Sequence, residues 1–232
     1  QFEASWYDGQ KIKLSRDRVD RLGFFTQVGI ETQEVPGSPD QVDLMINVVE
    51  KPTGSIQLGA GFSSAEKVSL SFGIKQENVF GSGNYLGLDV NTSKYNRTLV
   101  VSTTNPYFTD SGISRTYDVF YRTTRPYYDS GAYQIITKGA SVRFGVPFSE
   151  VDTVFFGAGV EGNQIKPGNY MPGIYSIYCG GLSGEQVGCS KTGIPLTLGW
   201  SRDNRDSALA PNSGRYQRLN LEASFLSDMR YM

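Results

Sequence analysis

From about residue 54 onward, apolar residues alternate with small or polar residues along most of the chain. The stretch 53–62 shows this clearly. One face of an extended chain there carries Ile56, Leu58, Ala60 and Phe62, and the opposite face carries Ser55, Gln57, Gly59 and Gly61. A period of two predicts a β-strand whose two faces meet different surroundings.

The same alternation predicts nine strands after the N-terminal region. They cover roughly 54–62, 67–77, 84–94, 97–107, 113–124, 138–147, 153–165, 193–202 and 215–226. Such strands could form a soluble sandwich with the apolar face inside, or a membrane barrel with the apolar face toward lipid. Arg143 and Glu161 lie between apolar neighbours, which is costly in a dry core and ordinary in a wet lumen. Small Gly and Ser residues also fill a sandwich core poorly, so the pattern favours the barrel.

The turns and aromatic residues support the barrel. Short turns at 80–83, 109–112 and 149–152 contrast with a long segment, 166–191, at the other end. Membrane barrels show such asymmetry between their two ends. Aromatic residues lie near strand ends, as in interfacial girdles, although isolated aromatics on a soluble β-protein remain the alternative. They are Tyr107, Phe108, Tyr127, Tyr128 and Phe148. Nine is an odd number and a sheet edge cannot face lipid, so we expect further strands outside this sequence.

The residues before 53 predict a different, α+β unit. Asp8 is a candidate N-cap for a helix that runs to about Leu22 and stops at Gly23. A strand over 24–35, a turn at 36–40 and a strand over 42–49 then predict a hairpin. We expect this unit to lack its first part.

Composition narrows the function. Charged residues make up 19% of the chain, whereas it contains 27 glycines, 14 tyrosines and 13 phenylalanines, which is typical of a β-rich protein. The net charge of −1 gives no electrostatic case for nucleic acid. The sequence has no apolar run long enough for a spanning helix, and alternating strands never produce one. Histidine is absent, which removes Ser-His-Asp catalysis and most zinc sites, so we expect neither an enzyme nor a cofactor.

Several motifs, in collinear order over nearly the whole chain, resemble the BamA family, the central subunits of the bacterial outer-membrane β-barrel assembly machine. They are R-L-G-F-F (21–25), V-P-G-S-P-D-Q-V-D (35–43), T-G-S (53–55), N-V-F-G-S-G (78–83), T-N-P-Y-F-T-D-S-G (104–112) and W-S-R-D-N-R-D-S-A-L-A-P-N-S-G (200–214). Each motif alone is weak, and their order and spacing carry the resemblance.

The resemblance implies five periplasmic POTRA domains followed by a sixteen-stranded antiparallel transmembrane β-barrel. Residues 1–52 would be the C-terminal part of the fifth, α+β POTRA domain, and residues 53–232 the first nine strands of the barrel. The other POTRA domains, the last seven strands and the family's arginine motif of the sixth loop are not in this sequence. The implied location is the outer membrane, with the N-terminal part in the periplasm.

The resemblance also implies a functional strand at the start of the barrel. In this family the first strand meets the last at a weak seam, the lateral gate, where incoming barrel proteins are thought to pair and enter the membrane. The matching residues are Thr53, Gly54, Ser55, Ile56, Gln57, Leu58, Gly59, Ala60, Gly61 and Phe62. An exposed edge offers unpaired N–H and C=O groups to a client strand, and glycines weaken a strand. The alternative is an ordinary first strand that simply pairs with the last.

The implied partners are outer-membrane lipids, nascent β-barrel proteins and the accessory lipoproteins BamB, BamC, BamD and BamE. Glu3, in F-E-A-S-W, matches a POTRA position through which the family contacts BamD. A solvated surface carboxylate without such a contact is the alternative.

Cys179 and Cys189 lie in the long segment that this topology places outside the cell. An oxidising compartment and an even number of cysteines favour a disulfide between them. Closing about eleven residues would stabilise the fold by on the order of 3 kcal/mol in the chain-entropy model. A metal site is the alternative, but two cysteines without histidine make a poor ligand set.

The favoured function is therefore a non-enzymatic insertase for outer-membrane proteins that acts through the first strand without ATP. A secretion pore of the same superfamily is the main alternative. A passive porin would lack the POTRA-like residues 1–52, and a barrel enzyme would need a nucleophile with a base.

Overall fold

The structure, a computed structural model, describes residues 4–64, 66–126, 133–205 and 212–225 of the 232-residue chain. The chain divides into two compact units, Gln1–Gly54 and Ser55–Met232. Within the described residues, no helix has the length and apolar character needed to cross a bilayer.

The first unit is one helix and one hairpin. Helix α1 (Gly9–Arg21) begins after Asp8, whose Oδ1 accepts hydrogen bonds from the backbone N–H groups of Gln10 (2.9 Å) and Lys11 (3.2 Å). These bonds satisfy two of the free donors of the first turn, as the sequence predicted. Strands β1 (Phe25–Val35) and β2 (Ser38–Glu50) pair antiparallel across a two-residue turn, in which Gly37 has φ of +86°.

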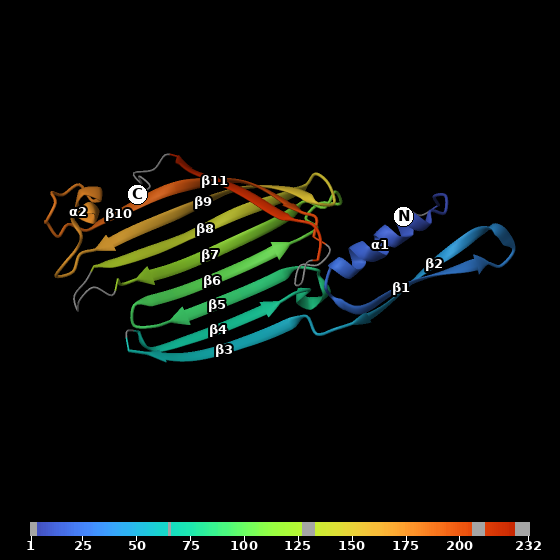
Figure 1. Ribbon diagram of the computed structural model, residues 1–232, viewed down its shortest axis with the longest axis horizontal. Coiled ribbons are helices and arrows are strands. Elements are labelled where there is room, and N and C mark those ends of the chain that lie inside the picture. Colours follow the sequence, from blue (N-terminus) through green and yellow to red (C-terminus); the bar gives the residue numbers. More distant parts are fainter. Residues whose placement is uncertain (1–3, 65, 127–132, 206–211, 226–232) are drawn as a thin grey trace. The chain divides into compact units, whose positions relative to one another are not determined.

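The second unit is one antiparallel sheet of nine strands that lie side by side in sequence order (Figure 1). The strands are β3 (Gly54–Ser63), β4 (Lys67–Gln76), β5 (Tyr85–Thr92), β6 (Asn96–Asn105), β7 (Ser114–Thr124), β8 (Gln134–Pro147), β9 (Asp152–Lys166), β10 (Cys189–Asp203) and β11 (Tyr216–Phe225). The 3₁₀ turn η1 (Val79–Gly81) joins β4 to β5, and helix α2 (Gly173–Tyr178) lies between β9 and β10.

The register puts apolar residues of all the strands on one face. Leu88 pairs with Val101, Val101 with Val119, and Val119 with Ala140, and the row continues through Val160 on β9. Many of these side chains are exposed, among them Val119 (56%), Val160 (55%) and Leu198 (53%). The buried apolar side chains of the described residues are only Tyr133, Ile136, Ile165 and Met171. Among the described residues, no protein core thus covers the apolar face.

The opposite face is polar and internally hydrogen-bonded. Ser102 Oγ donates to Asp118 Oδ1 (2.6 Å), and Arg143 Nη2 lies 3.7 Å from Asp118 Oδ2. Thr137 Oγ1 donates to Asn163 Oδ1 at 2.6 Å. The polar face therefore pairs Arg143 with Asp118, and Glu161 accepts a hydrogen bond from Asn163 Nδ2 at 2.8 Å, which agrees with the wet surface that the positions of Arg143 and Glu161 in the sequence predicted.

Glycine is required on this polar face where neighbouring backbone approaches closely. A Cβ placed on Gly157 of β9 would lie 2.7 Å from Thr197 Oγ1 and 2.9 Å from the carbonyl oxygen of Val142. Real Cβ atoms do not come so near, and a backbone carbonyl cannot turn away. The small residues of the polar face thus allow tight strand packing.

The prediction of a mainly β fold with nine strands is confirmed. Most strand boundaries agree with the sequence pattern within two residues, whereas β2, β8 and β10 each begin four residues earlier than predicted. The predicted turn at 36–40 was therefore too long, because Ser38 already pairs with Val35. The early starts of β8 and β10 pair with the end of β9, because Gln134 lies opposite Lys166 and Cys189 opposite Ile165. Tyr127 and Tyr128, predicted as girdle residues, lie outside the described residues.

Gly157→Ala should destabilise the barrel unit, because the added methyl group meets the carbonyl of Val142. Such overpacking costs roughly 1–3 kcal/mol. Gly162→Ala on the same strand is the control, because a Cβ on Gly162 would have no atom nearer than 3.8 Å, an ordinary contact distance. Urea unfolding in lipid vesicles, followed by tryptophan fluorescence, measures the difference. Equal midpoints for the two variants would contradict the close approach.

Candidate functional site at the edge strand

Strand β3 is an outermost strand of the sheet and hydrogen-bonds to β4 alone among the described residues. Every residue of β3 is exposed, in contrast to the mixed burial of β7, β8 and β9. On its apolar face, Ile56 is 70% exposed, Leu58 79% and Phe62 77%. The strand therefore offers both a backbone edge and an uncovered apolar face.

The polar face of β3 is flat beside β4. A Cβ on Gly61 would lie 2.7 Å from Ser69 Oγ, and a Cβ on Gly59 would meet Ser71 Oγ. Gln57 sits farther along the same face, because a Cβ on Gly73 would lie 3.7 Å from the Cβ of Gln57. Glycine opposite serine leaves few side-chain contacts between the two strands, so β3 is held mainly by its backbone hydrogen bonds.

The apolar face next to the edge contains a shallow groove. Its volume is about 480 Å³, and it crosses from β3 over β4 to β5. The residues that line it are Leu58, Gly59, Ala60, Leu70, Ser71, Phe72, Val90 and Thr92. A groove of this kind can hold an apolar side chain or an acyl chain that approaches along β3.

A larger hollow of about 720 Å³ lies on the polar face and reaches β11. Its lining includes Thr116, Arg143, Tyr216, Arg218 and Glu222. Within it, Arg218 Nε donates to Asn220 Oδ1 at 3.2 Å. Hydroxyl, amide and charged groups of both signs make this a hydrated surface rather than a binding pocket for one ligand.

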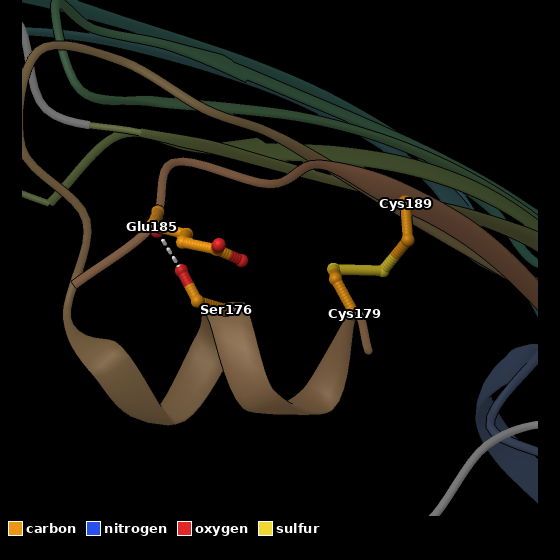
Figure 2. Close-up of a disulfide and its surroundings, with 4 residues drawn as sticks. All are labelled: Ser176, Cys179, Glu185 and Cys189. Carbon is orange, nitrogen blue, oxygen red and sulfur yellow. Dashed lines mark hydrogen bonds between the residues drawn. A yellow bond between two sulfur atoms is a disulfide. The ribbon is translucent and has the colours of Figure 1, made fainter. Parts of the chain in front are cut away.

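The segment between β9 and β10 is folded and cross-linked (Figure 2). A disulfide joins Cys179, which follows α2, to Cys189, the first residue of β10, with 5.3 Å between the two Cα atoms. Figure 2 also shows the fully buried Ser176, whose hydroxyl donates to the carbonyl oxygen of Glu185. The Glu185 carboxylate in turn accepts from the backbone N–H of Leu182 at 2.8 Å.

A small apolar cluster fixes this segment to the ends of the strands. It consists of Tyr133, Ile165 and Met171, with Tyr175 packed against them at 4.8 Å between the rings of Tyr133 and Tyr175. Burial, together with the hydrogen bond to Tyr175, raises the pKa of Tyr133 to about 12. Burial also raises the pKa of Tyr178, helped by the negative charge of Glu161. A phenol with its ordinary pKa of about 10 is already neutral at physiological pH, so the raised values only reinforce the neutral form in which both rings pack.

The structure places the predicted site residues in different regions. The residues from Gly54 to Phe62 all lie in β3, and Thr53 immediately precedes it. Glu3 lies outside the described residues. The sequence prediction put both cysteines in the long loop, and this was wrong for Cys189, because that residue begins β10 and pairs with Ile165.

The sequence prediction missed helix α2. Pro172 before the helix and Gly180 after it, with φ of +87°, were the available signals. A helix of six residues is too short for apolar periodicity to stand out.

A single sheet of antiparallel strands in sequence order, with one apolar face and one polar face, has the structure of the wall of a transmembrane β-barrel. The chain belongs to the Omp85 superfamily, whose domain matches residues 78–232.

Individual relatives agree with this assignment. The chain is 35% identical over 231 residues to "Outer membrane protein assembly factor BamA" of Neisseria meningitidis serogroup B, a match that covers 96% of the chain. It is 32% identical over 156 residues, or 67% of the chain, to the protein of the same name from Nitratidesulfovibrio vulgaris. The crystal structure of BamA from Haemophilus ducreyi lacking POTRA domains 1–3 matches 98% of the chain with a TM-score of 0.73 and 27% identity.

The chain is much shorter than these proteins. It spans 29% of the Neisseria protein, 19% of the Nitratidesulfovibrio protein and 44% of the Haemophilus chain.

Replacing both cysteines, Cys179→Ser with Cys189→Ser, should loosen the segment around α2 without unfolding the sheet. The loop is anchored by the small cluster around Met171, so the loss of about 3 kcal/mol expected for the cross-link falls on the loop itself. Hydrogen exchange of the backbone amide of residue 179, which closes the last turn of α2 through its bond to the Tyr175 carbonyl at 3.0 Å, measures this opening.

Amides in the middle of β7 serve as the control and should exchange at the wild-type rate. Unchanged protection of α2 in the double variant would show that the apolar cluster alone holds the segment.

Proposed function

We propose that this chain is part of an outer-membrane protein assembly factor that folds and inserts β-barrel proteins through a lateral gate at β3. The observation that carries the proposal is the outermost strand β3 with glycines on its polar face, in a chain that is similar to BamA proteins over nearly its whole length. The protein would reside in the outer membrane, with residues 1–52, as the C-terminal part of a fifth POTRA domain, in the periplasm. Residues 53–232 would form the first nine strands of the barrel.

The mechanism follows from the backbone of the edge strand. An incoming strand can hydrogen-bond to the free side of β3 and thereby satisfy its own N–H and C=O groups before it meets lipid. Few side-chain contacts hold β3 to a neighbour, because Gly59 and Gly61 present no side chain. A seam made from this strand would open at low cost.

Strand length supports local thinning of the membrane near the gate. β5 has 8 residues and spans about 27 Å at about 3.4 Å per residue, whereas β9 has 15 residues and spans about 51 Å. A strand tilted by about 45° needs about 9–11 residues to cross the hydrocarbon. β3 and β4, with 10 residues each, have the ordinary length and β5 is slightly shorter, so the thinner side of the proposed membrane contact would lie at this end of the sheet.

The proposed partners are nascent outer-membrane barrel proteins, outer-membrane lipids and the accessory lipoproteins BamB, BamC, BamD and BamE, with Glu3 as a contact for BamD. The work of insertion would come from strand pairing and lipid deformation, without ATP and without a chemical reaction. Specificity for barrel clients would arise from a pairing edge that accepts any strand of suitable alternation.

Gln57→Cys in the full-length protein should form a disulfide with cysteines placed in the last strand of a stalled client barrel. Gln57 lies on the polar face of β3, where a paired client strand would be about 5 Å away. The expected result is a cross-link that peaks at one client position and falls at its neighbours, because a fixed register puts a single client residue opposite Gln57 and turns the adjacent side chains to the other face. Mobility shifts on non-reducing gels measure it.

Ser71→Cys is the matched control. It lies on the same face but on β4, so a client strand paired to β3 would be about 10 Å away, beyond the reach of a disulfide. Cross-links of Gln57→Cys only to the protein's own last strand, with client present, would favour a closed secretion pore over an insertase.

A further inference from the structure

The apolar face of the sheet carries one arginine in an aromatic frame. Arg115 is the second residue of β7 and pairs with Phe144 of β8, so it belongs to the face that carries Val119 and Val101. It lies beside the short turn between β6 and β7, at the end of the sheet opposite α2 (Figure 1). A charge on this face, at the end of a strand, lies where the hydrocarbon of a bilayer meets the head groups.

Two rings hold the guanidinium in place. Its Cζ lies 3.9 Å from the centre of the Phe108 ring and 5.0 Å from that of Tyr117. The turn that carries Phe108 is closed by two hydrogen bonds, from Phe108 N to the Ile113 carbonyl and from Gly112 N to the Thr109 carbonyl, both 2.9 Å. Because its guanidinium already stacks on these rings, Arg115 loses little side-chain conformational entropy when it binds an anion.

Within the part of the chain that the structure describes, the charge of Arg115 has no carboxylate partner. Among the described residues, no carboxylate lies within 4 Å of its guanidinium, and its buried Nε has no hydrogen-bond partner. Arg202 is the contrast. It lies on the same face and at the same end of the sheet, but its Nη1 is 3.6 Å from Asp152 Oδ2. Arg202 is thus neutralised by Asp152, whereas Arg115 has no such partner among the described residues.

The aromatic frame continues across the neighbouring strands. The ring of Phe108 lies 6.2 Å from that of Phe144, and Phe144 lies 5.3 Å from Phe156 in a stacked arrangement. The three rings thus form an apolar surface next to the guanidinium of Arg115, near the same end of the strands. The combination suits a molecule with an anionic head and a hydrocarbon tail.

We propose that Arg115, framed by Phe108 and Tyr117, binds the phosphate of a membrane phospholipid whose acyl chain lies along Phe144 and Phe156. A guanidinium donates two parallel hydrogen bonds to a phosphate, which a stacked arginine is already oriented to do. The inference rests on the placement of the barrel in the outer membrane that is proposed above, but not on the lateral gate.

The test is native mass spectrometry of the full-length protein, released from detergent micelles that contain phosphatidylglycerol. Wild-type protein should retain the lipid, and Arg115→Gln should weaken its retention about tenfold, the effect of one charge-assisted contact. Dioleoylglycerol, which has the same tails without phosphate, should not be retained. Inorganic phosphate at the same concentration should not displace the lipid, because it lacks the acyl chain that contacts the aromatic row.

Arg202→Gln is the matched control and should retain phosphatidylglycerol as the wild type does. Equal retention by Arg115→Gln and wild type would overturn the proposal, as would an equal loss in both variants, which would indicate a diffuse basic interface. Displacement by inorganic phosphate would indicate a free-anion site instead. If Arg115→Gln does not fold, Phe108→Leu replaces it, since removal of the ring should also weaken retention.

This measurement is independent of client insertion. Arg115-dependent lipid binding without cross-links from Gln57 would leave the lipid site standing and refute the gate. Cross-links from Gln57→Cys, together with lipid binding that does not depend on Arg115, would support the gate and refute the lipid site.

Discussion

The constraint on which this structure depends is that hydrocarbon offers no hydrogen bonds to a backbone. Each strand from β4 to β10 satisfies its backbone N–H and C=O groups by pairing with an antiparallel neighbour on both sides. A strand at the edge of a sheet cannot satisfy the backbone groups on its outer side without a further partner. β3 therefore either pairs with another strand or stays away from lipid, and in the proposed function an exchange of its partner is the step that drives insertion.

The same constraint explains why the two faces of the sheet are so different. Hydrocarbon accepts the apolar face without a protein core, which is why side chains such as Val119 and Leu198 are exposed. The polar face can carry Asp118 and Arg143 because water remains nearby and the two charges lie together. A dry sandwich would have to bury that pair, at a cost that the Coulomb attraction seldom recovers.

How far the sequence predicts this structure depends on the range of the interactions. The strands were predictable because alternation is local, and Asp8 was predictable as a cap because its partners are two and three residues away. The early starts of β8 and β10 were not, because they depend on pairing with the end of β9. The frame around Arg115 was missed for the same reason, since Phe108 comes from a turn and reaches Arg115 only when the hairpin closes.

Stability is therefore distributed unevenly along the wall. The strands β8, β9 and β10 have 14 to 15 residues, and their far ends are fixed by the Met171 cluster and the Cys179–Cys189 disulfide. The strands β3, β4 and β5 have 8 to 10 residues and no such cross-link. Since local opening follows contact density, motion should concentrate at the β3 side while the β8–β10 side keeps its register. The proposed gate needs this combination, because one border of its seam would have to open without loss of the barrel.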